Sequence, residues 1–258
     1  MRWIDEPLAR ARGRTPRELL LLAAGVGYTV FELTSEAPCW PNVVMYASAT
    51  IAFALRFFPA RAIGVGVALG ALAQRLPDLR YGTAELETPH LWIALAAIAV
   101  LSSRDLEARF ERAPSRLRWL PNAWAALPAA DLRRLRWCVY ALAALAAGLG
   151  YTWGVPFADT GVDPRLVIGV IGSLVALIAL LAAGRAPALL LVPLVTLPIA
   201  AMLGSQVVEA EGILAGRALP FLDFGLWRWP AFVLPGTLLA LLAAGLATPY
   251  AVRLLRRI

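Results

Sequence analysis

Apolar stretches of nearly membrane-spanning length recur from one end of this 258-residue chain to the other. About 20 residues of helix are needed to cross the roughly 30 Å of hydrocarbon in a bilayer. With 60% hydrophobic residues and a mean hydropathy of +0.70, the chain leaves little sequence for a water-soluble domain. The sequence therefore predicts an all-α polytopic membrane protein with eight transmembrane helices, whose apolar cores are 19–34, 42–58, 62–76, 90–103, 136–154, 164–183, 187–207 and 229–250.

Arginines separate the connecting segments into two alternating sets. The chain has 24 arginines and no lysine, and 19 of the arginines lie in the set formed by 1–18, 56–61, 104–136, 185 and 253–258. Positive residues are retained on the cytoplasmic side of membrane proteins. We therefore expect both termini to be cytoplasmic, in a bacterial inner membrane. This topology accounts for the formal charge of +7, so no nucleic-acid partner is expected.

The first apolar segment has a counterpart in the middle of the chain. AAGVGYT at 23–29 recurs as AAGLGYT at 146–152, and the same offset places Glu36 on Asp159. Each copy would contain four helices, and because four is an even number the two copies would point the same way. We expect two parallel four-helix repeats, related by an axis along the membrane normal.

The repeat divides the chain into three expected segments. These are a first repeat at 1–113, a cytoplasmic arginine-rich connector at 114–135 and a second repeat at 136–258. Residues 104–113 are expected to extend the fourth helix up to a break at Pro114. In the connector, arginines alternate with apolar residues, which favours contact with anionic lipid headgroups.

Acidic and aromatic residues gather at the predicted outer end of the first helix of each repeat. Glu32 lies one helical turn beyond Tyr28 and shares its face, where a carboxylate at the edge of the hydrocarbon could bind a cation or a proton. Acids at the water boundary also occur in ordinary solvated loops, and both interpretations stay open. In parallel repeats, one outer ligand-binding site would bring together Tyr28, Glu32, Glu36, Tyr151, Asp159 and Asp163.

Small and hydroxyl-bearing residues mark the second and third predicted helices. Such residues usually join helices in lipid, so helix packing is expected, and the lining of a ligand cleft is the alternative. The residues concerned are Tyr46, Ser48, Thr50, Gly64, Gly66 and Gly70.

The only histidine of the chain, His90, excludes several kinds of site. One imidazole cannot supply a bis-histidine haem or an HExxH zinc centre, and no phosphate-binding glycine loop stands in a suitable context, so no metal and no cofactor are expected. Cys39, Arg75 and His90 follow one another in an order that resembles the Cys-Arg-His layout of exosortase-type membrane transpeptidases. That resemblance implies these three residues as catalytic candidates; a loop cysteine and an interfacial histidine are the alternative.

Residues 27–74 carry a second resemblance. WPN at 40–42 opens a helix that ends in LRFFP at 55–59, and GVALGAL follows at 66–72. These motifs are similar to the opening helices of MASE1-type membrane sensor domains. The resemblance implies an eight-helix membrane domain with a role in signalling.

Three classes of function are compatible with these features. The leading hypothesis is a non-enzymatic membrane module that binds a small ligand, a lipid or a partner helix at the outer face between the repeats. It would serve as a sensor-like domain or as a membrane subunit of a complex. The first alternative is a small-molecule or ion transporter or channel that uses the cleft between the repeats, and the second is a Cys/His membrane transpeptidase-like enzyme.

Overall fold

The computed structural model describes residues 13–34, 40–73, 89–113, 122–125, 127–152, 164–183, 187–208 and 228–255. Every regular element within these ranges is a helix. In chain order the helices are α2 (Pro16–Thr34), α3 (Trp40–Ala54), α4 (Ala60–Ala73), α6 (Pro89–Leu101), α7 (Arg104–Glu107), the π-helix η1 (Ala108–Arg112), α8 (Ala129–Thr152), α9 (Pro164–Ala182), α10 (Pro187–Ser205) and α12 (Arg228–Leu255). The all-α class predicted from the sequence is confirmed for this part of the chain.

Each of the eight predicted apolar cores overlaps one of these helices. Four of the helices begin with proline, a residue favoured at the first helical position because its missing N–H has no intrahelical partner there. These prolines are Pro16, Pro89, Pro164 and Pro187.

The segment after the fourth predicted core differs from the expectation. The fourth helix does not continue to Pro114, because α6 ends at Leu101 and the chain turns before α7 begins. Ser103 has an extended backbone, with φ −65° and ψ 140°, at the N-cap of α7. Serine at this position favours the start of a new helix. The following long helix, α8, begins at Ala129, within the segment predicted as a connector.

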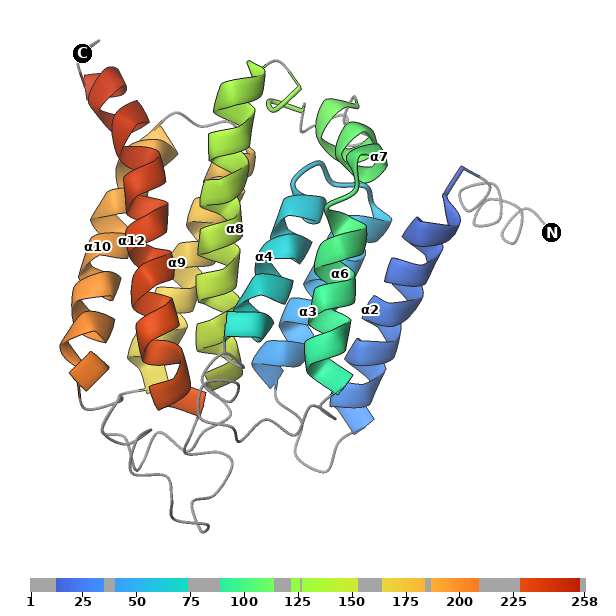
Figure 1. Ribbon diagram of the computed structural model, residues 1–258, viewed down its shortest axis with the longest axis horizontal. Helices are drawn as coiled ribbons and strands as arrows, with labels where there is room; N and C mark the ends of the chain where they lie inside the picture. Colours follow the sequence, from blue (N-terminus) through green and yellow to red (C-terminus); the bar gives the residue numbers. More distant parts are fainter. Residues whose placement is uncertain are drawn as a thin grey trace.

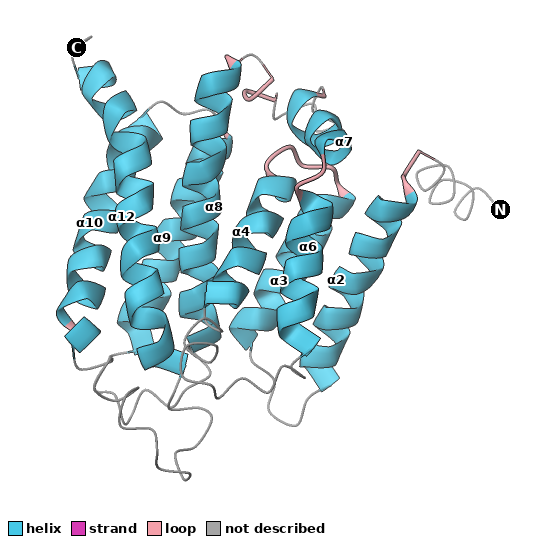
Figure 2. Ribbon diagram, viewed as in Figure 1, coloured by secondary structure: helices cyan, strands magenta, loops and turns pink. Residues whose placement is uncertain are grey.

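The helices of the bundle run side by side, and the start of α2 lies at the same end as the finish of α12 (Figure 1). The turns that join α3 to α4 and α6 to α7 lie at this end too (Figure 2). In the first half of the chain, α2 packs on α3, α3 on α4 and α4 on α6. In the second half, α8, α9, α10 and α12 form a closed ring of contacts.

Close packing of α4 on α8 joins the two halves. Gly66 and Gly70 lie one turn apart on the face of α4 that meets α8. A Cβ atom at Gly66 would lie 2.7 Å from the carbonyl oxygen of Tyr140, and one at Gly70 would lie 2.5 Å from that of Ala144. These distances are too short for any side chain, so the two backbones approach as closely as they do because both residues are glycine.

The turn after α3 holds α2 in place. Arg56 has a positive φ of 49°, and the bonds Phe57 N to Ala52 O and Arg56 N to Phe53 O form a Schellman motif around it. Glycine usually occupies this position, because other residues are strained there. Here the arginine donates to the carboxylate of the fully buried Glu18 of α2 at 2.7 Å. The ion pair therefore ties the first turn of α2 to the end of α3.

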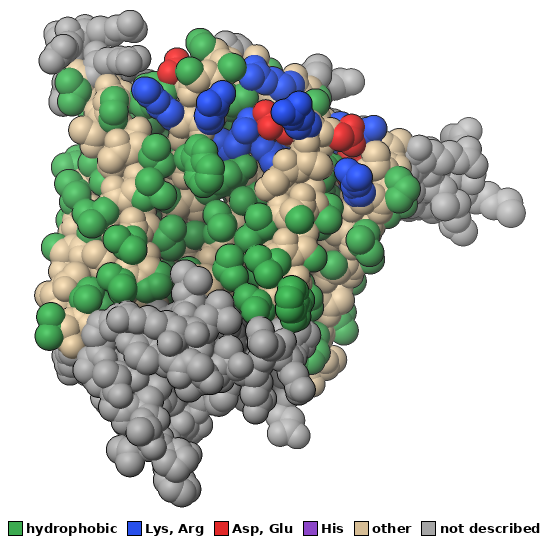
Figure 3. Space-filling view, viewed as in Figure 1, with side chains coloured by type: hydrophobic (Ala, Val, Ile, Leu, Met, Phe, Trp, Pro, Cys, Tyr) green, Lys and Arg blue, Asp and Glu red, His purple; other side chains and the backbone are tan. Residues whose placement is uncertain are grey.

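Within the described ranges, two helical segments, Ala188–Ser205 and Phe232–Val252, are long and apolar enough to cross a membrane. Ala60–Ala73, Leu91–Leu101 and Gly169–Ala182 are apolar but shorter. On the face of the molecule in Figure 3, charged side chains gather at one end and hydrophobic side chains cover the helices below them. We call the end that carries these charges the arginine-rich end.

The close contact between α4 and α8 predicts that Gly70→Leu destabilises the protein. The leucine side chain has no space beside the Ala144 carbonyl, and overpacking typically costs about 1–3 kcal/mol. The expected result is a melting temperature lowered by several degrees in purified protein, at about 2–4 °C per kcal/mol for a chain of this size.

Gly172→Leu is the matched control for this substitution. Gly172 is exposed on α9, and no heavy atom of a neighbouring residue lies within 4 Å of the position its Cβ would take. An equal fall in melting temperature for the two variants would contradict the proposed role of Gly70.

Candidate functional site: a cavity among α2, α3, α4 and α6

A cavity of about 190 Å³ lies inside the first half of the chain, among α2, α3, α4 and α6. None of the described residues that line it is charged, and most are alanine, glycine, leucine or another apolar residue. Three lining residues carry a hydroxyl group, namely Tyr28, Tyr46 and Thr50. The cavity therefore suits an apolar group, with a few positions for hydrogen bonding.

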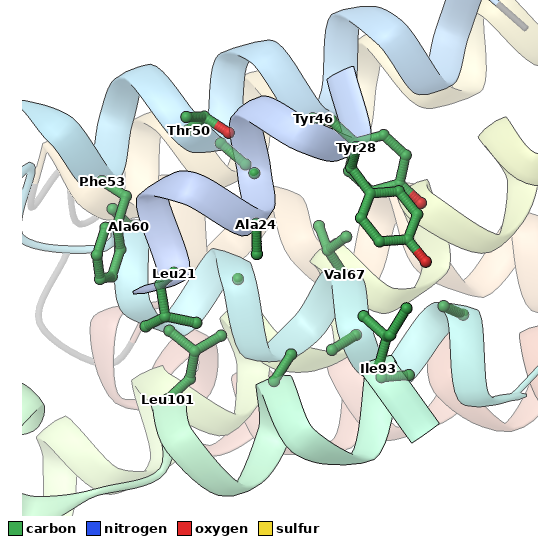
Figure 4. A pocket seen from close by; sticks show the side chains of 17 residues that line it. Leu21, Ala24, Tyr28, Tyr46, Thr50, Phe53, Ala60, Val67, Ile93 and Leu101 are labelled. Carbon is green, nitrogen blue, oxygen red and sulfur yellow. The ribbon is translucent and has the colours of Figure 1, made fainter. Parts of the chain in front are cut away.

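The two tyrosines mark one end of the cavity. The rings of Tyr28 from α2 and Tyr46 from α3 lie 5.2 Å apart between centroids, at 45° to one another. Figure 4 shows them on the same side of the cavity, away from Phe53 and Leu101, which mark the other end. Phe53 and Leu101 are both buried, so this second end is closed.

The wall of the cavity depends on the way α2 packs. A Cβ atom at Gly25 would collide with the Thr50 side chain, so α2 and α3 approach closely at this level. α6 packs instead on α4, where a Cβ at Gly64 would lie 3.0 Å from Leu101 Cδ1. Among the described residues, no comparable packing joins α2 to α6. The cavity lies between these two helices.

The second half of the chain is packed differently at the matching glycine. The sequence repeat aligns Gly25 with Gly148, and the ring of Phe232 from α12 lies directly against the Gly148 backbone. Phe232 is fully buried, and α12 packs directly on α8. An aromatic side chain therefore occupies the space between the first and last helices of this half.

A buried network of charges adjoins the closed end of the cavity. Arg61 of α4 donates from Nε to Glu111 at 2.8 Å and from Nη1 to the Leu101 carbonyl at 2.7 Å. Arg136 of α8 donates from Nε to the other Glu111 oxygen at 2.9 Å and from Nη2 to Glu107 at 2.6 Å. Arg61 and Glu111 are 1% and 0% exposed. Two arginines and two glutamates therefore pair where α4, α8 and the α7–η1 segment meet, with Arg61 and Glu111 buried and Glu107 partly exposed.

Two residues that follow η1, Asn122 and Trp124, pack beside the charge network. Asn122 donates to the carbonyls of Glu111 and Ala113 at 3.0 and 2.7 Å. Trp124 is fully buried, with its ring edge-on to Phe58 at a centroid distance of 5.7 Å. The described part of the connector is therefore built into the protein at this end.

Two of the six residues predicted for the outer site have described side chains. Tyr28 lines the cavity, whereas Glu32, one turn further along α2, is half-buried and is not a lining residue. Tyr151 lies in α8, but its side chain is outside the described part, as are Glu36, Asp159 and Asp163. The convergence of the six residues stays a prediction.

The residues predicted from the transpeptidase resemblance cannot be placed against one another. His90 lies in the first turn of α6 with its side chain outside the described part, and Cys39 and Arg75 lie outside it altogether. The other cysteine, Cys138, is a free thiol buried between α8 and α12, with Sγ 3.9 Å from the Ala243 carbonyl oxygen.

Five of the six small and hydroxyl-bearing residues of the second and third predicted helices take one of the two expected positions, and Ser48 is exposed. Gly66 and Gly70 join helices, whereas Tyr46, Thr50 and Gly64 line the cavity. The sequence does not distinguish the packing residues from the lining residues, because both occur on helices of similar apolar composition.

No pattern in the sequence indicates the buried charge network. Its arginines and glutamates lie in segments that resemble ordinary cytoplasmic ends. Among the described residues, no group of three or more His, Cys, Asp or Glu side chains could hold a metal ion.

Comparison with known proteins assigns no family to this arrangement. No protein-family model, curated protein or solved structure matches the chain. The chemistry of the site is therefore inferred from its own residues.

The charge network predicts that Glu111→Gln destabilises the protein strongly. Arg61 and Arg136 would keep their positive charges in a buried site after losing the carboxylate that both contact. Removing one partner of a buried ion pair typically costs about 3–5 kcal/mol. The free energy of unfolding of the purified variant, from denaturant titration, measures the loss.

Asp105→Asn provides a matched change of carboxylate to amide. Asp105 pairs with Arg109 at 3.1 Å, but both side chains are well exposed, so this pair is worth about 1 kcal/mol or less. If the two variants lost equal stability, the network would have no special structural role.

Proposed function

We propose that this protein is an integral membrane module, with eight membrane-spanning helices, that binds a small apolar ligand without catalysis in the cavity among α2, α3, α4 and α6. The observation that carries the proposal is the uncharged lining of that cavity. The ligand would contact Tyr28, Tyr46 and Thr50 through hydrogen bonds and the remaining wall through apolar packing.

The packing of the helices supports a membrane location for the whole bundle. α12, which contains one of the two segments of membrane-spanning length, packs on α8, and α8 packs on α4. Large apolar side chains stay exposed at the surface of the bundle, among them Leu20, Phe31, Trp92 and Leu194. Large apolar side chains exposed on several helices are unfavourable in water and suit contact with lipid.

The distribution of charge supports the orientation in the membrane that the sequence predicts. The arginine-rich end would be cytoplasmic, with both termini, and the cavity end near Tyr28 and Tyr46 would face the outer side of a bacterial inner membrane. α2 and α8 both begin at the arginine-rich end (Figure 1), as parallel four-helix repeats require.

The position of the cavity refines the expected binding site. The leading hypothesis from the sequence placed a ligand between the repeats. There α4 and α8 pack directly on each other at Gly66 and Gly70, which leaves no space for a ligand at this contact. The proposed site lies inside the first repeat, and only part of its lining falls within residues 27–74, the stretch that resembles membrane sensor domains. A sensor-like role, or that of a ligand-binding subunit in a membrane complex, is therefore favoured over ion transport, because charged groups are absent among the described lining residues.

Filling the cavity should abolish binding of a small apolar probe. We expect a photoactivatable phenyldiazirine to label wild-type protein in nanodiscs saturably, with labelling suppressed by excess toluene, because an apolar cavity of about 150 Å³ already binds benzene. Ala97→Phe, which places a ring in the cavity, should remove the saturable labelling, measured by mass spectrometry of peptides.

Ala96→Phe makes the same change one position earlier on α6. Ala96 is exposed and does not line the cavity, so saturable labelling should persist in this variant. If excess toluene did not reduce the labelling of wild-type protein, the proposal would be wrong.

The topology predicts which thiols react in intact cells. Cys39 should react with a membrane-impermeant maleimide added outside, while the buried Cys138 should not react from either side. In a Cys39→Ala background, Ser102→Cys places a thiol at an exposed position of the arginine-rich end, and it should react only after permeabilisation. The opposite pattern would invert the orientation.

A further inference from the structure

We infer that the occupant of the cavity is the hydrocarbon chain of a bilayer lipid, which enters sideways between α2 and α6. The inference rests on the proposed function and specifies the ligand and its route. It follows from the opening of the cavity, its shape and the polarity of its two ends.

The cavity opens through the side of the bundle. Ala24 of α2 and Ile93 of α6 both line it, yet Ala24 is exposed and Ile93 is 41% exposed. The neighbouring surface of α6 is apolar as well, with Trp92 59% and Leu95 39% exposed. In a membrane-spanning bundle, a lateral opening with such a rim faces lipid chains and not water.

The shape of the cavity favours a single chain. Its lining on α6 extends from Ile93 to Leu101, a rise of about 12 Å along the helix axis. Its volume is about 190 Å³. A partner helix, about 10–12 Å wide with its side chains, is too thick to enter so small a space. An extended hydrocarbon chain is narrow enough and can continue through the opening into the bilayer.

The uncharged lining disfavours ions and charged solutes as ligands. An ion or charged solute would lose its hydration there without gaining a charged partner among the described lining residues. A hydrocarbon chain loses no hydrogen bonds on entering and fills space that water would occupy unfavourably.

The two ends of the cavity give the chain a direction. The end formed by Phe53 and Leu101 is buried and apolar, and it suits a terminal methyl group. The opposite end carries the hydroxyl groups of Tyr28 and Tyr46, which suit the ester group near a lipid headgroup (Figure 4). A lipid in this direction belongs to the leaflet opposite the arginine-rich end.

Two photoactivatable phosphatidylcholines test the inference in nanodiscs of the full-length protein. One carries a diazirine near the methyl end of an acyl chain, and the other carries it near the ester. We expect the first to label residues around Phe53 and Leu101 and the second to label residues around Tyr28 and Tyr46, as mapped by mass spectrometry. Ala97→Phe should lower labelling at all four positions about tenfold, and Ala96→Phe should leave it unchanged.

Removing the two tyrosine hydroxyls tests the contact with the ester. Tyr28→Phe with Tyr46→Phe keeps both rings and should lower labelling by the ester-proximal probe about two- to tenfold, the range expected for one lost hydrogen bond. Labelling by the methyl-end probe at Leu101 is the internal reference for chain occupancy in the same variant.

The outcomes separate this inference from the proposed function. If phenyldiazirine labels the cavity saturably but neither lipid probe does, the site takes a free apolar solute and the lipid assignment is wrong. If none of the three probes labels the cavity, both the assignment and the proposed function fail. Lipid labelling that is reversed along the cavity, or equal in wild type and Ala97→Phe, would also overturn the inference.

Discussion

The contact between α4 and α8 is the constraint on which the rest of the structure depends. Gly66 and Gly70 bring the two backbones together, and a side chain at either position would force them apart. At the arginine-rich end the same two helices are joined through Arg61, Glu111 and Arg136, which are bound in one buried network. Close backbone packing fixes the separation of the helices, and paired charges fix their register, because a shift along the axis would leave a buried charge unpaired.

Around this contact, the two outer helices of the first half each pack on a different neighbour. α2 packs on α3 and is fastened by Glu18 and Arg56, while α6 packs on α4. Neither helix needs the other as a support, so the space between them can stay open. In the second half, Phe232 fills the space beside Gly148 and α8 packs directly on α12. One half thus serves as a packed support and the other carries a cavity.

The cavity also depends on the placement of the charges. Arg61 is not a lining residue, and it donates to the Leu101 carbonyl and to Glu111. An unpaired arginine in this position would favour an anionic ligand. Because the Arg61 guanidinium donates to Glu111 and to the Leu101 carbonyl, the polar groups among the described lining residues are hydroxyls.

The sequence by itself determined the helical class and the approximate position of each long helix, because apolar runs of this length have few other ways to satisfy their backbone hydrogen bonds. It also predicted Tyr28 as a ligand-binding residue, and Tyr28 lines the cavity; packing, the expected role of the α4 glycines, is observed at Gly66 and Gly70. Gly25 and Gly148 have nearly identical neighbours in the sequence. The sequence did not determine that Gly25 would border an open cavity and Gly148 a space filled by an aromatic ring. That difference was decided by Phe232 and by the separation of α2 from α6, contacts between residues far apart in the chain. The pairing of Arg61 with Glu111, fifty residues away, likewise arises only when α4 and η1 meet in the folded protein.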